Sequence, residues 1–184
     1  MKRSMIALGC TLVAGPALAQ SIGERTGVNS AFGISPTMAD FIKEAANSDM
    51  LQIAAATFAQ EKGNAEEKKF AEQMMTDHSK TSSELKSLVD SGAVEADIPT
   101  ALDSSSQKKL DKLRDTRRQA FASEYDPMQV GAHKEAVSLF ERYSKSGDNP
   151  KLKDWAGKTL PTLQHHLEMA EDLGKAPSVG QSRK

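Results

Sequence analysis

Apolar side chains recur every three or four residues in four long stretches, and this periodicity is the feature that most constrains the fold. Each stretch ends at or just before a glycine, and three of them begin at a Ser or Asn of the kind that caps helix N-termini. The predicted helices cover 35–63, 64–92, 117–146 and 149–174. Proline at positions 36 and 150 suits the first turn of a helix, which supports two of the predicted starts.

The rest of the chain adds one short helix and no strands. Residues 104–115 carry a brief apolar seam in the long connection between the second and third helices, whereas no run alternates as a strand requires. Short turns near positions 63 and 147 predict an all-α four-helix bundle over residues 36–174. The longer connection permits, without requiring, a ferritin-like crossover. Pro127 and Pro161 lie inside predicted helices, where each should cause a kink or a break.

The N-terminal segment has the features of an export signal. Lys2 and Arg3 precede an apolar run over 5–13, and Ala17–Leu18–Ala19 forms a small-x-small cleavage site. We therefore predict a signal peptide over 1–19, a flexible leader over 20–35 and a disordered tail over 175–184. The predicted location is the periplasm or the extracellular space. Lipid anchoring at Cys10 is a less favoured alternative, because the apolar run before it is very short.

Cleavage at this site changes which chemistries remain open. It removes the chain's single cysteine, so the mature protein has neither a disulfide nor a thiolate metal ligand. It also lowers the Lys and Arg count from 24 to 22 against 25 Asp and Glu, a net charge of −3. An acidic balance without a basic block argues against nucleic-acid binding. No later apolar run is long enough to cross a membrane.

Histidines are placed unusually. His78, His133 and His166 each share a helix face with apolar residues three, four or seven positions away, whereas His165 falls on a polar face. Counted from Asn149, His133 and His166 lie at about the same height, and His78 lies within about one turn of them. A buried imidazole must be hydrogen-bonded, paired with a charge or bound to a metal. The sequence leaves these possibilities open.

Ligand chemistry argues against a ferritin-like di-iron centre at these histidines, because such centres require Glu-x-x-His pairs. The residues three positions before the histidines are apolar: Met75, Val130 and Leu163. Copper, zinc or nickel suits an imidazole site better. Met74, Met75 and Met169, each about one turn from a histidine, are possible additional ligands for copper. Met50 and Gln52 of the first predicted helix would lie at the height of these histidines, and both side chains are neutral.

Enzymatic motifs are not evident in the sequence. No nucleophile elbow and no phosphate-binding glycine loop occur, so no catalytic residue is assigned. The favoured hypothesis is a non-enzymatic binding or stress-related module. The alternative is a periplasmic transition-metal-binding protein that uses the inward histidines. Neither the ligand nor a partner follows from the sequence.

Four segments together carry a family resemblance: FIKEAA at 41–46, FAEQMMTDH at 70–78, HKEAVSLF at 133–140 and TLPTLQHHL at 159–167. In this order they resemble the bacterial exported family called domain of unknown function 4142, whose members are often labelled predicted outer membrane proteins. The resemblance spans about residues 36–173 and implies a ferritin-like bundle and export, not an activity. His78, His133 and His166 match the family's histidines. Similar sequences often carry Glu where this chain has LQIA at 51–54.

Overall fold

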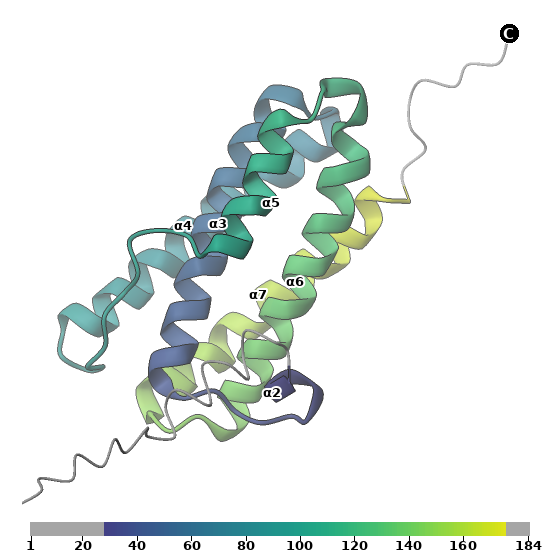
Figure 1. Ribbon diagram of the computed structural model, residues 1–184. Coiled ribbons are helices and arrows are strands. Elements are labelled where there is room, and N and C mark those ends of the chain that lie inside the picture. Colours follow the sequence, from purple (N-terminus) through teal and green to yellow (C-terminus); the bar gives the residue numbers. More distant parts are fainter. Residues whose placement is uncertain (1–27, 176–184) are drawn as a thin grey trace, which may run out of the picture.

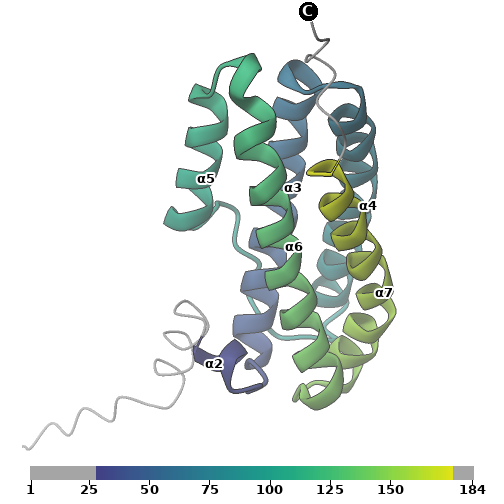
Figure 2. The same ribbon diagram turned by 90° about the vertical axis from the view of Figure 1, so that its right-hand side faces the viewer.

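The computed structural model describes residues 28–175, and the predicted signal peptide at 1–19 lies outside this range. The described part is all-α and contains no strand. Its four longest helices lie side by side, as Figures 1 and 2 show. In chain order the helices are α2 Val28–Ala31, α3 Met38–Lys62, α4 Ala65–Asp90, α5 Ser104–Asp115, α6 Phe121–Ser146 and α7 Pro150–Leu173.

The α3–α4 hairpin is formed by local signals on both sides of a tight turn. A Cβ at Gly63 would lie 2.5 Å from the Ala59 carbonyl oxygen, so only glycine fits there. Asn64 then caps α4, and Glu67 completes the predicted capping box by accepting from the Asn64 backbone. The predicted start of the first helix was wrong: its cap is Thr37, which accepts from the Asp40 backbone, so Ser35 and Pro36 precede the helix.

The second hairpin, α6–α7, has an equivalent turn. Asn149 caps α7 with Pro150 in the first turn, as the sequence predicts. The third long helix begins later than predicted, because 118–120 form a 3-10 turn and α6 starts at Phe121. Pro127 does not divide α6, and Pro161 does not divide α7. Pro127 lies in the second turn, where it removes a single backbone hydrogen bond near a helix end.

The connection between the hairpins determines the topology. Residues 91–103 return along the outside, so α4 and α6 run in the same direction while α3 and α7 run in the opposite one (Figure 2). α5 packs against α3 and α6. Asn47 joins this connection to α3: its Nδ2 donates to Ser106 Oγ at 2.8 Å, and its Oδ1 accepts from the Asp103 backbone at 2.9 Å. The long connection is therefore held against α3 by these two hydrogen bonds.

The core consists of two apolar clusters stacked along the helix axes. The lower cluster, near the α6–α7 turn, is built around Phe41, Phe140, Tyr143 and Trp155. The upper cluster, near the α3–α4 turn, contains the remaining buried apolar side chains, among them Leu51, Phe70, Met74, Phe121 and Tyr125. Between them lies a layer of buried polar residues: Asp49, His78, His133 and His166. The polar layer therefore separates the two apolar clusters.

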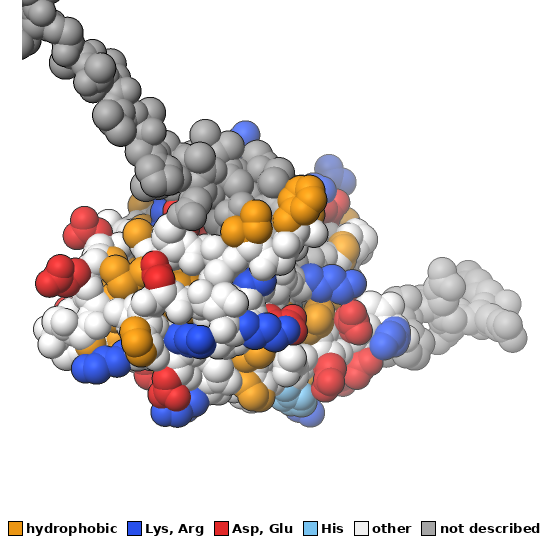
Figure 3. Space-filling model, turned by 90° about the horizontal axis from the view of Figure 1, so that it is seen from below, with side chains coloured by type: hydrophobic (Ala, Val, Ile, Leu, Met, Phe, Trp, Pro, Cys, Tyr) orange, Lys and Arg blue, Asp and Glu red, His pale blue; other side chains and the backbone are white. Residues whose placement is uncertain are grey.

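The outer surface carries both signs of charge. On the face that Figure 3 shows, Lys and Arg side chains are interspersed with Asp and Glu. Several charged side chains of the described helices pair within one helix, as in Lys86–Asp90 and Lys158–Asp154. Among the described residues, no helix is both long and apolar enough to cross a membrane.

Candidate metal centre

Three histidines from three helices meet in the polar layer. His78 comes from α4, His133 from α6 and His166 from α7, and each side chain is only 1% exposed. Their ring centroids lie 5.8 Å (His78–His133), 5.3 Å (His78–His166) and 5.6 Å (His133–His166) apart. One nitrogen of each ring lies within 4.8 Å of the corresponding nitrogens of the other two. The prediction that these histidines lie inward at a common height is confirmed, and we call them the histidine triad.

His78 is oriented by a buried carboxylate on α3. Asp49 is 5% exposed, and its Oδ1 accepts from His78 Nδ1 at 2.8 Å. The same carboxylate accepts from the hydroxyls of Thr81, at 2.9 Å, and Ser82, at 3.0 Å. Because a carboxylate only accepts hydrogen bonds, Nδ1 carries the proton of His78. Its Nε2 is buried without a hydrogen-bond partner.

His166 is oriented by a second carboxylate, closer to solvent. Its Nε2 donates to Asp77 Oδ2 at 2.8 Å, and Gln73 donates to the same oxygen at 2.6 Å. Burial alone raises the pKa of Asp77, but the hydrogen bonds from Gln73 and His166 more than offset it, and the net pKa is lowered. Burial also lowers the pKa of His166, so the neutral ring is favoured. Its Nδ1 is left unprotonated and inward.

His133 completes the pattern with a backbone partner. Its Nδ1 donates to the Gln129 carbonyl oxygen one turn earlier at 2.9 Å. Burial, together with the nearby His78, lowers the pKa of His133 to about 3. The ring is therefore neutral near pH 7, and its Nε2 presents a lone pair.

The triad thus places three unpartnered ring nitrogens in the buried interior. His78 Nε2, His133 Nε2 and His166 Nδ1 are buried, and none has a hydrogen-bond partner. Buried polar atoms normally have partners, and an orphaned one costs about 1–3 kcal/mol. Nothing in this geometry supplies a donor to any of the three. A cation that accepts three nitrogen ligands satisfies all of them at once.

The methionines considered near the triad differ in burial. Met74 is fully buried in the upper cluster, one turn from His78 on the same face. Met169 is partly buried and packs against that cluster, whereas Met75 is 38% exposed on the outer face of α4. Met50 is only partly buried, and α3 presents Asp49 and Gln52 to the interior instead.

The sequence analysis missed two carboxylates that bond the triad, Asp49 and Asp77. The first helix was expected to offer neutral groups only, and Asp49 corrects this. It follows Ala45 by four residues and precedes Gln52 by three, so the apolar stripe itself was the available signal. Asp77 cannot share a face with its neighbour His78, but it reaches His166 on α7. No single-helix pattern reveals that contact.

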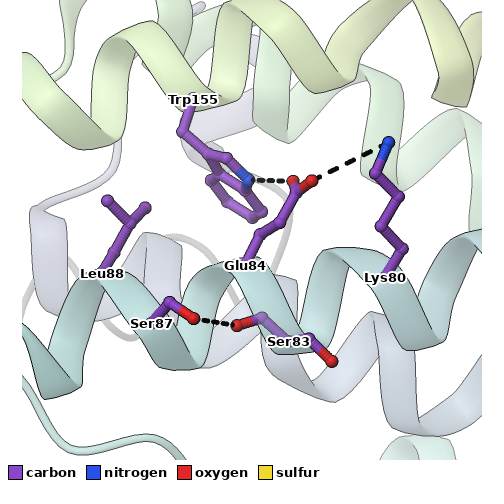
Figure 4. Close-up of a pocket in the computed structure, with 6 residues that line it drawn as sticks. All are labelled: Lys80, Ser83, Glu84, Ser87, Leu88 and Trp155. Atoms are coloured by element: carbon purple, nitrogen blue, oxygen red, sulfur yellow. Dashed lines mark hydrogen bonds and ion pairs between the residues drawn. The ribbon is translucent and has the colours of Figure 1, made fainter.

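Two surface hollows are less suited to metal chemistry. The pocket in Figure 4 lies between α4 and α7, and its polar groups are already paired: Trp155 donates to Glu84 at 2.9 Å, and Lys80 approaches Glu84 at 3.8 Å. A wider cleft lies among α2, α3, α5 and α6 and is lined by Lys43, Glu135 and several serines. Neither brings together a convergent set of unpaired donors.

Comparison with known proteins identifies the family. The family model described as Domain of unknown function (DUF4142) matches residues 23–173, which include every helix of the described structure and all three triad histidines. No curated protein and no solved structure matches the chain. The chain therefore belongs to the DUF4142 family.

Proposed function

We propose that this protein binds a divalent transition-metal ion through His78, His133 and His166. The observation that carries the proposal is the convergence of three buried imidazoles: one nitrogen of each ring lies within 4.8 Å of one nitrogen of each other ring, and each ring has one nitrogen without a hydrogen-bond partner. Metal–imidazole bonds are about 2.0–2.1 Å long, so metal binding draws the nitrogens closer together. Small rotations of the rings supply that movement.

The hydrogen bonds around the triad support a metal site rather than a purely structural polar core. Ligating histidines usually donate their second N–H to a carboxylate or a backbone carbonyl, which fixes the tautomer. Here Asp49, Asp77 and the Gln129 carbonyl fill those roles. Three rings that merely stabilised the core would use both nitrogens, as buried polar groups generally do.

Charge balance favours a divalent ion. As metal ligands the three imidazoles are neutral and contribute no charge, and two carboxylates, Asp49 and Asp77, lie beside the rings. A divalent cation among the rings neutralises both. Three nitrogen ligands with no ligating carboxylate or thiolate suit copper, zinc or nickel, and they do not match the Glu-x-x-His ligands of di-iron proteins.

The proposal includes a fold type and a location in the cell. We infer that the four long helices form a ferritin-like four-helix bundle, an inference supported by the parallel course of α4 and α6. Residues 1–19 support export to the periplasm, where such a protein would bind metal without catalysing a reaction. The role in the cell is that of a metal-binding module.

Titration of the metal-free protein tests the proposal. Zn²⁺, Cu²⁺ and Ni²⁺ are added separately in a calorimeter, with His78→Ala, His133→Ala and His166→Ala beside the wild type. His165→Ala is the matched control, because that ring is exposed on the same helix as His166. We expect dissociation constants tighter than about 10 μM, which is roughly −7 kcal/mol, and a large loss only in the triad variants. Weaker binding by the wild type, or equal loss in the control, refutes the proposal.

A further inference from the structure

Three histidines leave a four-coordinate metal one ligand short. Zinc sites with three protein ligands keep their fourth position for water or substrate, whereas structural sites have four protein ligands. Among the described residues, the triad is the only convergent group of this kind, and it contains no fourth member. The fourth ligand must come from the surroundings of the triad, which differ on its two sides.

The side facing the lower cluster offers nothing to a ligand. There the neighbouring positions on the four helices are Ala45, Thr81, Ala136 and Leu163, all buried. The Thr81 hydroxyl is the polar group of this set, and it already donates to Asp49. This side is closed by apolar packing.

The side facing the upper cluster is different. One turn from the polar layer, the four helices contribute Gln52, Met74, Gln129 and Ala170, each no more than 1% exposed. We call these residues the glutamine layer. These residues lie at about the same height along the bundle. On α3 and α7 they follow the polar layer by three or four residues, and on α4 and α6, which run the opposite way, they precede it by four. Ala170 fills little of the space that a larger side chain would occupy.

Both glutamine amides in this layer lack partners. The Nε2 and Oε1 atoms of Gln52 and of Gln129 are buried without a hydrogen bond. Four orphaned atoms from two neutral amides are costly in an apolar interior. An amide both donates and accepts, so the pair matches a small ligand that does the same.

We propose that the metal's fourth coordination position faces the glutamine layer and holds an exchangeable water or hydroxide that hydrogen-bonds to Gln52 and Gln129. This inference rests on the proposed metal site. The amides contact the ligand and not the metal, and a small anion that binds metals end-on can replace the water. The protein is then a metal centre with one exchangeable ligand position beside two buried amides.

A line of buried polar groups leads from this position toward the end of the helices. On α6, Tyr125, Gln129 and His133 follow one another at intervals of four residues, on one face. The Tyr125 hydroxyl is buried without a partner, as are one oxygen of Glu67 and one of Asp126 near the start of α4 and α6. Internal water typically satisfies such groups. This line is the route by which the ligand exchanges with solvent.

Cobalt substitution and azide test the proposal on the folded protein. Co²⁺ is titrated into the metal-free wild type and followed by its visible spectrum, which reports metal binding by itself. Sodium azide is then titrated into the Co²⁺-loaded protein. Gln52→Leu and Gln129→Leu remove the amides at similar size, and Met74→Leu is the matched control in the same layer.

We expect azide to shift the cobalt spectrum of the wild type and of Met74→Leu. Each glutamine variant should bind azide about tenfold more weakly, the loss expected for one hydrogen bond to a charged ligand, with Co²⁺ affinity within about threefold of wild type. Co²⁺ binding without any azide response in the wild type overturns this inference alone. So does an azide affinity that rises in Met74→Leu and stays unchanged in both glutamine variants, because the thioether would then compete with azide for the fourth position. Failure of the wild type to bind Co²⁺ overturns the proposed function and this inference together.

Discussion

Replacing Asp49 by Asn isolates the contribution of one buried carboxylate to metal affinity. The side chain keeps its size, and its Oδ1 can still accept from His78 Nδ1, a bond of 2.8 Å in the native protein. The substitution removes the negative charge that strengthens this bond. Hydrogen bonds to charged groups contribute about 1.5–3 kcal/mol and neutral ones about 0.5–1.5 kcal/mol. The difference, about 1–1.5 kcal/mol, corresponds to about a tenfold loss of affinity, the lower end of the 10–100-fold range for such second partners.

The assay is a competitive Zn²⁺ titration of wild type, Asp49→Asn and Asp90→Asn. Asp90 lies on the outer face of α4, paired with Lys86, so its substitution controls for the general loss of negative charge. We expect about tenfold weaker Zn²⁺ binding for Asp49→Asn and none of this loss for Asp90→Asn. Wild-type affinity in Asp49→Asn would refute the reasoning, because Asp49 would then merely fill a polar space beside His78.

Three further predictions concern stability. Phe140→Ala should lower the free energy of unfolding in urea by about 3–5 kcal/mol, because the Phe140 ring packs edge-on against Phe41, with centroids 4.9 Å apart, and beside Trp155, with centroids 5.4 Å apart. A change below about 0.5 kcal/mol, typical of surface sites, would contradict this packing. Asn64→Ala should cost about 1 kcal/mol in the same assay by removing the α4 cap, and an unchanged midpoint would show that the capping box is dispensable. The metal-free protein should lose stability as the pH falls from 6.5 toward 3, because the His133 pKa is about 3 when folded but 6.5 when unfolded. As the pH falls, the unfolded chain therefore takes up the proton first, and the free energy of unfolding drops by about 1.4 kcal/mol per pH unit. Urea midpoints that stay flat from pH 7 to about 4.5 would contradict a buried neutral His133.

Local sequence signals predicted the helices because their causes are local. The caps at Asn64 and Asn149 and the glycines at 63 and 147 act within a few residues, so the two hairpins could be recognised directly. The start of α3 was misplaced because Ser35–Pro36 and Thr37 offer competing caps two residues apart. The hydrogen bond from the Asp40 backbone to Thr37, which decides between them, is visible only in the folded chain.

The triad could be predicted in part, for a similar reason. Each inward histidine is visible as a polar residue on an apolar stripe, and equal distances from a turn place two of them level. The partners of those histidines could not be predicted, since they depend on the long connection between the hairpins. Asp77 contacts a ring 89 residues later in the chain. Such contacts follow from topology and not from any pattern within one helix.

The separation of the triad across the two hairpins has a kinetic consequence. His78 belongs to the α3–α4 hairpin, whereas His133 and His166 belong to the α6–α7 hairpin. Neither hairpin alone holds three donors, so the complete site exists only after the hairpins have docked. An ion bound there stabilises the native state by mass action and connects the α3–α4 hairpin to the α6–α7 hairpin. If the hairpins dock after the transition state for folding, the bound ion slows unfolding and leaves the folding rate almost unchanged. The lifetime of the loaded protein is then set by the concentration of free metal around it.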